Sequence, residues 1–347
     1  MNALPEVDHY LIVGFDSDIE LASQQLPALK VDMEPLLRRE IAPVADLGCF
    51  FRLRSAVKHS APEFVVTHQS KAGALGRLAA WSSGVPVVHS LSMASFGPGY
   101  SRIRDLVFRT VERALARITT LYLVVGEDLA ARFAEVGVPS EKLKVVRSGI
   151  RLSGPDTDPR ALKMRIGEQW GVSPDIPWLV HVGALEERKN VDLLPPLMSD
   201  IREALGEQPA HLFIVGAGPL RARVEESTAA LDLTESITLT GHVDEALDYI
   251  RAAQVVLLLS SAEGMPQVLV QAAAVGTRFV AFEVEGPGEL LRLGAEGAVV
   301  PPNGHSTFVD MVLRYSQMHE PASVIDVSSW SAETIRSKYR DLFRALP

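Results

Sequence analysis

The sequence contains a single cysteine, Cys49, so no intramolecular disulfide can stabilise the fold. It also lacks long apolar runs: uninterrupted stretches such as Val255–Leu259 are far too short to cross a bilayer. The first nine residues carry acidic side chains and no basic segment, which argues against a signal peptide. We therefore expect a protein of the reducing cytoplasm, with at most a peripheral contact to a membrane.

Basic residues are outnumbered by acidic ones, 34 Lys and Arg against 43 Asp and Glu, which gives a net charge of −9. The excess lies in the second half: residues 1–150 hold 17 basic and 16 acidic side chains, and residues 151–347 hold 17 and 27. Binding to nucleic acid requires a cationic surface that neutralises phosphates. The charge balance therefore disfavours nucleic acid as a partner.

Several common catalytic signatures are missing from the sequence. There is no GxxxxGKS/T loop, which disfavours a Walker-type nucleotide hydrolase, and no GxSxG elbow of the serine hydrolases. Neither an HExxH segment nor a pair of cysteines is present to hold zinc. These absences disfavour the most familiar hydrolase classes.

Short runs rich in Val, Ile and Leu alternate with longer amphipathic stretches through both halves of the chain. Near-continuous apolar strands indicate parallel sheets covered on both faces, and regular alternation of strand and helix indicates doubly wound α/β domains. With 347 residues, 47% of them hydrophobic, the chain is long enough for two such domains. The expected strands are 10–15, 64–67, 85–89, 121–125, 143–146, 178–182, 211–215, 237–239, 255–259, 279–282 and 298–300. The expected helices include 72–82, 103–118, 160–170, 267–275 and 332–345.

A segment rich in proline and glycine, Arg151–Pro177, is typical of a connection between domains. We therefore expect an N-terminal domain at residues 1–155 and a C-terminal domain at residues 156–325. The remaining residues, 326–347, are expected to include a helix that packs back on the N-terminal domain.

Two short motifs have both a functional and a structural interpretation. Gly216–Ala217–Gly218 follows an expected strand, but Arg221 replaces the third glycine of a dinucleotide fingerprint, so a tight turn is the better interpretation. Asp16–Ser17–Asp18 has the form of a site for a divalent metal on a sugar diphosphate. A turn with helix-capping aspartates explains this second motif better.

The strongest local signal is the segment Ser260–Pro266, which follows an apolar strand and precedes an expected helix. The strand delivers Glu263 to the carboxyl end of a parallel sheet, where ligands bind in open α/β folds. Gly264 allows the backbone to come close to a ligand, and Pro266 suits the first turn of a helix. The amides at that helix start suit a phosphate, although an ordinary capped helix with a solvated glutamate has the same pattern.

The stretch from Ser260 to Leu290, SSAEGMPQVLVQAAAVGTRFVAFEVEGPGEL, resembles the Glu-x7-Glu region of the GT4-type retaining glycosyltransferases, which have the GT-B fold. Further segments agree with that family in order and spacing, from about residue 10 to the last helix. In the second half these are VGALEERKNVDLL (182–194), IVGAGPL (214–220) and LTGHV (239–243). In the first half they are VVTHQSKAGALGRLAA (65–80), VPVVHS (85–90), VVGEDLAARFAEVGV (124–138) and KVVRSGI (144–150).

The resemblance implies a GT-B architecture, in which two Rossmann-like domains face each other across a cleft. It implies that the C-terminal domain binds a nucleotide sugar and that the N-terminal domain holds the acceptor. Transfer in this family retains the anomeric configuration and needs neither a metal nor another cofactor. The expected partners are therefore a nucleotide-sugar donor and an acceptor that is a glycan, a lipid-linked molecule or a small molecule.

Carried over residue by residue, the family pattern makes Lys189 and Glu263 the expected catalytic residues. The lysine would face the leaving diphosphate, and the glutamate would face the donor sugar. A cation and a helix N-terminus directed at the leaving group stabilise the negative charge that develops on it. The expected donor-binding positions are Gly183, Arg188, Val243, Gly264, Met265, Pro266, Gln267 and Gln271. The expected acceptor-side positions are His68, Lys71, His89 and Ser92.

Three motif positions depart from the family. The usual arginine five residues before the lysine is Ala184, the second glutamate is Gln271, and the usual histidine after the fourth N-domain strand aligns with Ser92. We also expect the family's first strand, glycine-rich loop and first helix to be missing. Two alternatives to an active transferase therefore stay open. One is a weak or inactive accessory protein that binds a nucleotide sugar or a partner glycosyltransferase, and the other is a GT-B sugar-nucleotide epimerase.

One expected helix, within residues 103–118, is studded with arginine and has few acidic residues to oppose it. Such a helix suits a contact with anionic lipid or with a lipid-linked acceptor, although a solvated helix face has the same composition. The basic residues are Arg102, Arg104, Arg109, Arg113 and Arg117, and the acidic residues are Asp105 and Glu112.

Overall fold

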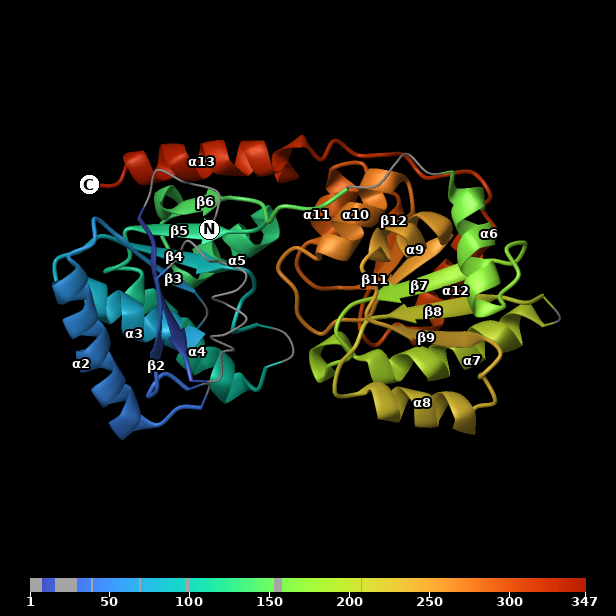
Figure 1. Ribbon diagram of the computed structural model, residues 1–347, viewed down its shortest axis with the longest axis horizontal. Coiled ribbons are helices and arrows are strands. Elements are labelled where there is room, and N and C mark those ends of the chain that lie inside the picture. The colour runs from blue at the N-terminus through green and yellow to red at the C-terminus, as the bar shows by residue number, and fades with distance from the viewer. Residues whose placement is uncertain are drawn as a thin grey trace. The chain divides into compact units, whose positions relative to one another are not determined.

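The computed structural model describes residues 8–15, 30–38, 40–68, 70–97, 100–152, 158–206 and 208–347. The chain divides into two compact units, one of Met1–Gly149 together with Ser329–Pro347 and the other of Ile150–Ser328 (Figure 1). The domain limits expected after residues 155 and 325 fall a few residues from these boundaries. The motif Asp16–Ser17–Asp18 lies outside the described residues.

A four-stranded parallel sheet with the order β3-β4-β5-β6 forms the centre of the first unit. Its strands are β3 (Val65–His68), β4 (Val87–Leu91), β5 (Leu121–Val124) and β6 (Leu143–Val145). The helices that connect them are α3 (Ser70–Trp81), α4 (Arg102–Leu115) and α5 (Glu127–Val136). The neighbouring strands are consecutive in the chain, as a run of β-α-β crossovers produces.

Alternate residues of β5 show how both faces of this sheet are covered. Tyr122 and Val124 pack in one cluster with Phe133 of α5, whereas Leu123 packs in another with Ile335 of α13 (Ala332–Arg344). Successive side chains of a strand point to opposite faces, so a strand covered on both sides must be apolar throughout. This explains the near-continuous apolar runs of the sequence, and it shows that α13 packs on the first unit.

Two further strands, β1 (Tyr10–Gly14) and β2 (Lys30–Glu34), form a separate parallel pair. The sequence does not predict β2, because KVDME contains three charged residues and no apolar run. Helix α2 (Pro43–Ser60) packs against α3 through a small core that includes Cys49, Leu53 and Ala79. The structure describes no membrane-spanning candidate, since none of the helices in the described ranges is long and apolar enough.

The second unit is built on a six-stranded parallel sheet with the order β12-β11-β10-β7-β8-β9. Its strands are β7 (Trp178–Val182), β8 (His211–Val215), β9 (Ile237–Gly241), β10 (Val255–Leu258), β11 (Arg278–Phe282) and β12 (Gly297–Val300). This is the doubly wound order, in which the chain starts at the centre and builds outward in both directions. Every expected strand is present within two residues at its ends, and all the named strand pairs are parallel, as predicted.

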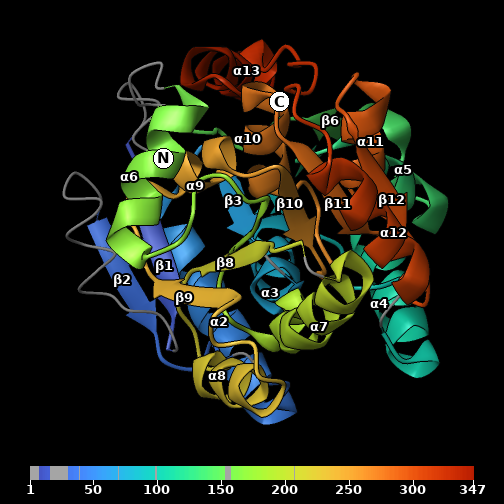
Figure 2. The same ribbon diagram turned by 90° about the vertical axis from the view of Figure 1, so that its right-hand side faces the viewer.

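Helices cover both faces of the six-stranded sheet (Figures 1 and 2). One face carries α7 (Leu194–Leu205), α8 (Arg221–Ala230) and α12 (His305–Ser316), which share a core with alternate residues of the central strands. The other face carries α9 (Ala246–Ala252) and α10 (Gln267–Val275). The remaining helices of the second unit are α6 (Pro159–Trp170) and α11 (Pro287–Arg292). Among the described residues of both units, 3₁₀ turns lie at Ser140–Lys142, Glu187–Lys189, Val191–Leu193 and Ser328–Trp330.

Candidate active site

The second unit reverses its direction of strand addition at β7. The chain adds β8 and β9 on one side of β7 and then returns to place β10 on the other. The loops that leave β7 and β10 diverge at this point, where open α/β sheets bind ligands. Hydrogen bonds tie these loops together: among them, the Ser261 amide donates to the Arg188 carbonyl at 2.9 Å, and the Asn190 side chain donates to the Leu259 carbonyl at 2.8 Å.

Lys189 and Glu263, the two expected catalytic residues, lie in direct contact. Lys189 Nζ is 2.5 Å from Glu263 Oε1, and Arg188 Nη1 is 3.3 Å from the same oxygen. Arg188 also donates to the Ala262 carbonyl at 3.0 Å and to Glu186 Oε1 at 2.7 Å. Glu263 is only 9% exposed, so water screens its contacts weakly. One carboxylate and two cations therefore converge at the switch point.

A single 3₁₀ turn, Glu187–Lys189, places the two cations beside the carboxylate. The turn ends at Asn190, which has a φ of 48°. This left-handed conformation is disfavoured for most side chains but is tolerated by asparagine. Because the Asn190 amide also holds the Leu259 carbonyl, the same residue ends the turn and fixes it to the end of β10.

Sequence reasoning missed a histidine next to this pair. His181, on β7, is completely buried, and its Nδ1 lies 3.2 Å from the Leu257 carbonyl oxygen. Its Nε2 has no hydrogen-bond partner among the described residues. A Cβ placed on Gly183 would lie 3.6 Å from that nitrogen and 3.7 Å from Lys189 Cε. Burial lowers the pKa of His181 to about 4, so a neutral ring packs behind Lys189.

Gly216, in the turn between β8 and α8, allows this turn to approach the β7 loop closely. A Cβ on Gly216 would overlap the Gly183 carbonyl, and Gly216 has a φ of 142°, which side chains rarely adopt. The Gly183 amide donates to the Val215 carbonyl at 2.9 Å. Within this segment the Arg221 amide donates to the Gly218 carbonyl at 3.2 Å, the hydrogen bond of a tight turn such as the sequence predicts. The Gly216 amide in turn donates to Gly241 at the end of β9, two residues before the expected donor-binding residue Val243, which is half-buried.

Helix α10 begins at Gln267, as expected, after the short loop that carries Glu263. Pro266 is its N-cap residue and no side chain caps it, whereas Gly264 and Met265 are buried in the preceding loop. Gly286 packs against this loop, since a Cβ there would lie 2.5 Å from the Pro266 ring. The loop that carries Glu263 is thus held from behind by a second backbone segment.

Gln271 and Ala184, two of the positions that depart from the family pattern, also lie in the second unit. The Gln271 side-chain amide, one turn along α10 from Gln267, donates to the Arg151 carbonyl at 3.3 Å. Ala184 lies between Gly183 and Leu185 in the β7 loop and offers no cation. No group of three His, Cys, Asp or Glu side chains that could hold a metal ion lies among the described residues.

The expected acceptor-side residues lie in the first unit and have different surroundings. His68 is the last residue of β3 and Ser92 follows the adjacent strand β4, and both residues are exposed. Lys71 Nζ forms an ion pair with Asp46 at 2.5 Å and also donates to the Glu40 carbonyl. His89 is 1% exposed and its Nδ1 lies 2.8 Å from Thr67 Oγ1. The ring of His89 therefore packs in the interior and does not reach a surface where an acceptor could meet it.

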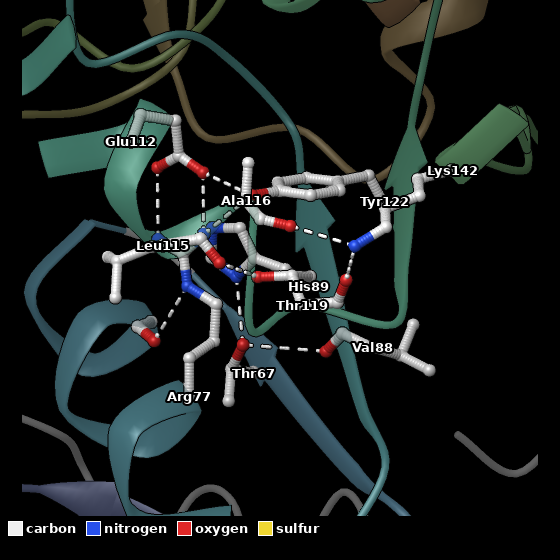
Figure 3. A network of polar contacts seen from close by, with 11 residues as sticks. Thr67, Arg77, Val88, His89, Glu112, Leu115, Ala116, Thr119, Tyr122 and Lys142 are labelled. Carbon is white, nitrogen blue, oxygen red and sulfur yellow. Dashed lines mark hydrogen bonds and ion pairs between the residues drawn. The ribbon is translucent and has the colours of Figure 1, made fainter. Parts of the chain in front are cut away.

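The interior of the first unit holds a charged network that sequence reasoning also missed (Figure 3). Arg77 forms a double ion pair with Glu112, at 2.5 Å and 2.9 Å, and donates to Tyr122 at 3.0 Å and to the Gly73 carbonyl at 3.1 Å. Tyr122 donates to Glu112 at 2.7 Å. His89 lies edge-on to the Tyr122 ring, and burial, with Arg77 nearby, lowers the pKa of His89 well below its usual value.

The fold and the residues at the switch point define a GT-B protein made of two Rossmann-like domains. Solved structures with the same fold include Anabaena HepE in complex with UDP and glucose, with a TM-score of 0.74, 16% identity and coverage of 96% of this chain and 92% of that chain. Another is sucrose-phosphate synthase from Thermosynechococcus elongatus, with a TM-score of 0.67, 18% identity and coverage of 96% and 98%.

Comparison by sequence identifies the family. Residues 176–317 match the family described as glycosyl transferases group 1, and residues 16–149 match the glycosyl transferase 4-like domain. The UDP-Gal:alpha-D-GlcNAc-diphosphoundecaprenol alpha-1,3-galactosyltransferase of Escherichia coli is 27% identical over 289 residues, 81% of this chain and 73% of that protein. The alpha-D-kanosaminyltransferase of Streptomyces kanamyceticus is 24% identical over 280 residues, 76% and 71%. The chain belongs to the GT4-type glycosyltransferases.

Proposed function

We propose that this glycosyltransferase moves a sugar from a nucleoside-diphosphate donor to an acceptor hydroxyl, with retention of configuration and without a metal. The observation that carries the proposal is the contact between Lys189 and Glu263 at the switch point, in the loop that precedes helix α10. Retention and metal independence rest on the resemblance of the Glu263 region to the Glu-x7-Glu segment of the family.

The chemistry follows from where charge develops. As the bond between the sugar and the diphosphate breaks, negative charge grows on the phosphate oxygens, and cations already held nearby stabilise it most effectively. Lys189 and Arg188 both contact Glu263 Oε1, so a bound diphosphate would compete with the carboxylate for these cations. The start of α10 adds backbone amides of the same polarity. Glu263, freed from the cations, would then contact the donor sugar.

Arg188 is proposed as the substitute for the arginine that Ala184 replaces. It comes from the same loop as Lys189 and reaches the same glutamate oxygen. The guanidinium carries several N–H donors in one plane and grips phosphate through two of them more effectively than a lysine does. Its partner Glu186 is 41% exposed at the side chain, so this contact is weak enough to yield to a phosphate.

Uridine diphosphate sugars are the first donors to test. The Escherichia coli relative is named for a UDP-Gal donor and a diphosphoundecaprenol-linked acceptor, and the Anabaena structure contains UDP and glucose. We propose the same nucleotide for this chain and leave the sugar to a panel of UDP- and GDP-sugars. Donor hydrolysis without an acceptor is the primary assay, because it needs no knowledge of the acceptor.

The decisive variants are Glu263→Gln and Lys189→Met. Each removes one charge at the site, and loss of one well-placed group of this kind typically lowers kcat by about 10²–10³-fold. Asp248→Asn is the matched control, since Asp248 also forms an ion pair, 2.6 Å from Arg165, in the same unit but on helix α9. Product NMR would report retention of the anomeric configuration, and EDTA should leave the rate unchanged.

A second function, that of an accessory protein without turnover, is favoured by Ala184 and Gln271. These residues remove one cation and one carboxylate from the family pattern. If the folded protein binds UDP but hydrolyses no donor in the panel, this second function replaces the first. Conversion of one UDP-sugar into its epimer without an acceptor would instead identify a sugar-nucleotide epimerase.

A further inference from the structure

The outward face of helix α4 carries large apolar side chains in contact with solvent. Ile103 is 78% exposed, Leu106 66%, Val107 51% and Val111 43%. Their spacing places them on one stripe of the helix. In the second unit, the described large apolar side chains that are exposed, such as Met164, Leu193 and Met318, lie on separate elements. Isolated apolar residues are normal on a surface, whereas a clustered stripe marks an interaction site.

Arginines flank this stripe, and no acidic side chain of the helix shares its face. Arg102 and Arg113 are exposed, and within the described residues neither forms an ion pair. Asp105 instead accepts hydrogen bonds from Arg109 and from the Gly97 amide. We call the surface of Arg102, Ile103, Leu106, Val107, Val111 and Arg113 the α4 face.

The second acidic residue of the helix also points away from the α4 face. Glu112 is buried and its charge is matched by Arg77 in the interior (Figure 3). The composition of the helix therefore understates its polarity: α4 contains four arginines and two acids, but the charged residues of the α4 face are cations only. A solvated helix face would need neither the burial of Glu112 nor the outward turn of the apolar residues.

We propose that the α4 face docks on an anionic membrane surface. A helix that lies flat on a bilayer buries an apolar stripe in the headgroup region while arginines beside it bind lipid phosphates. The whole chain carries a net charge of −9 and would be repelled by such a surface, so attraction requires a local cationic face of this kind. Charge complementarity thus favours an anionic bilayer over an acidic protein partner, which offers no hydrocarbon layer for the stripe.

The position of α4 gives this docking a consequence for the first unit. Helix α4 follows β4, so it starts at the carboxyl edge of the sheet, where His68 and Ser92 are exposed. A membrane on the α4 face would bring that edge close to the headgroups. The docking itself does not depend on the proposed donor chemistry.

Vesicle sedimentation of the full chain tests the proposal. Wild-type protein should bind vesicles of phosphatidylcholine with 25% phosphatidylglycerol, bind pure phosphatidylcholine much less, and lose most of its affinity in 0.5 M NaCl. Arg102→Ser combined with Leu106→Ser should weaken binding by roughly fivefold for the arginine and by a further roughly tenfold for the leucine. Both side chains are exposed, and a thermal melt equal to that of wild type would show that the variant folds.

The matched control is Arg160→Ser combined with Met164→Ser on helix α6. It also removes one arginine and one exposed apolar side chain, Met164 being 60% exposed, and it should change vesicle binding by less than twofold. Equal weakening by both pairs, or no wild-type binding to anionic vesicles, would overturn the proposal. The proposal would also be overturned if light scattering detects a dimer that Leu106→Ser dissociates, while the wild-type protein does not bind vesicles. Donor hydrolysis in solution should be unaffected by the α4 pair, so the test is separate from that of the proposed function.

Discussion

Two groups of similar chemistry occupy the two units of this protein. Each contains a glutamate, a cation and a buried neutral histidine: Glu112, Arg77 and His89 in the first unit, and Glu263, Lys189 and His181 in the second. In the first group Arg77 donates to both oxygens of Glu112, to Tyr122 and to the Gly73 carbonyl, and His89 Nδ1 lies against Thr67 Oγ1.

The second group is less complete. Lys189 and Arg188 both contact the same oxygen of Glu263, and His181 Nε2 has no hydrogen-bond partner among the described residues. A saturated charged network stabilises one conformation, whereas a group with spare hydrogen-bonding capacity can exchange its partners for a ligand. Burial and charge are similar in the two groups, and what distinguishes the candidate site is its unused hydrogen-bonding capacity.

The largest expected effect on stability comes from breaking the buried ion pair between Arg77 and Glu112. Glu112→Gln leaves Arg77 charged, 1% exposed and unpaired, and this should lower the free energy of unfolding by about 3–5 kcal/mol. Glu263→Gln should cost less than about 2 kcal/mol, because Arg188 remains 36% exposed and Lys189 lies at the edge of the sheet. Urea denaturation of both variants would check this, and equal losses would contradict the distinction.

Acidification should weaken both units through their buried histidines. The pKa of His181 is about 4 in the folded chain and 6.5 when unfolded, so the unfolded state binds more protons between these values. The contribution of His181 to stability is therefore complete above pH 6.5 and falls by roughly 3 kcal/mol by pH 4. The lowered pKa of His89 acts in the same direction. Urea denaturation at pH 7, 5.5 and 4 would measure the slope. His181→Phe should flatten it, and an unchanged slope would show that the ring titrates normally.

Two glycines extend the comparison of the two units to side-chain packing: Gly73 in the first unit and Gly183 in the second. A Cβ on Gly73 would overlap the His89 ring, so Gly73→Ala should destabilise the first unit by about 1–2 kcal/mol, after a gain in helix propensity. A Cβ on Gly183 would meet only ordinary contacts, so Gly183→Ala should fold normally and weaken UDP binding instead. Thermal melts and UDP titrations of both variants would test this. Loss of stability in Gly183→Ala would argue that the β7 loop is as tightly packed as the interior.

The smallest effect is expected at an exposed pair. Arg165 and Asp248 lie 2.6 Å apart, with the arginine side chain 59% exposed, so Asp248→Asn should change the free energy of unfolding by less than about 1 kcal/mol. This variant calibrates the others, because it removes the same charge at a similar distance. A loss as large as that of Glu112→Gln would mean that burial does not govern these pairs.

Much of the fold could be predicted from the sequence, because strands buried on both faces must be apolar along their whole length. The run at β10 meets this condition, β7 and β8 depart from it by one histidine each, and all three strands appear where expected. Strand β2 could not be predicted, since KVDME pairs only with β1 and three of its residues are exposed. Local composition reports burial, and a strand that buries little leaves little signal.

The candidate site was predictable in part for a different reason. Glu263 and Lys189 were assigned from motifs 74 residues apart, and the doubly wound topology brings them to one edge of the sheet. His181 was missed because one polar residue inside an apolar strand resembles a core position. His89 was expected beside the acceptor, but its ring packs inward because Gly73 leaves room for it against α3.

Patterns within short segments were enough to predict the family, the alternation of strand and helix and the loops that carry the candidate site. Only the tertiary structure decided which charges are satisfied and which are spare. Arg77 and Glu112 lie 35 residues apart, and the inward turn of Glu112 is what leaves α4 with a cationic outer face. Such pairing depends on the distances between side chains across the packed unit, and no local pattern encodes those distances.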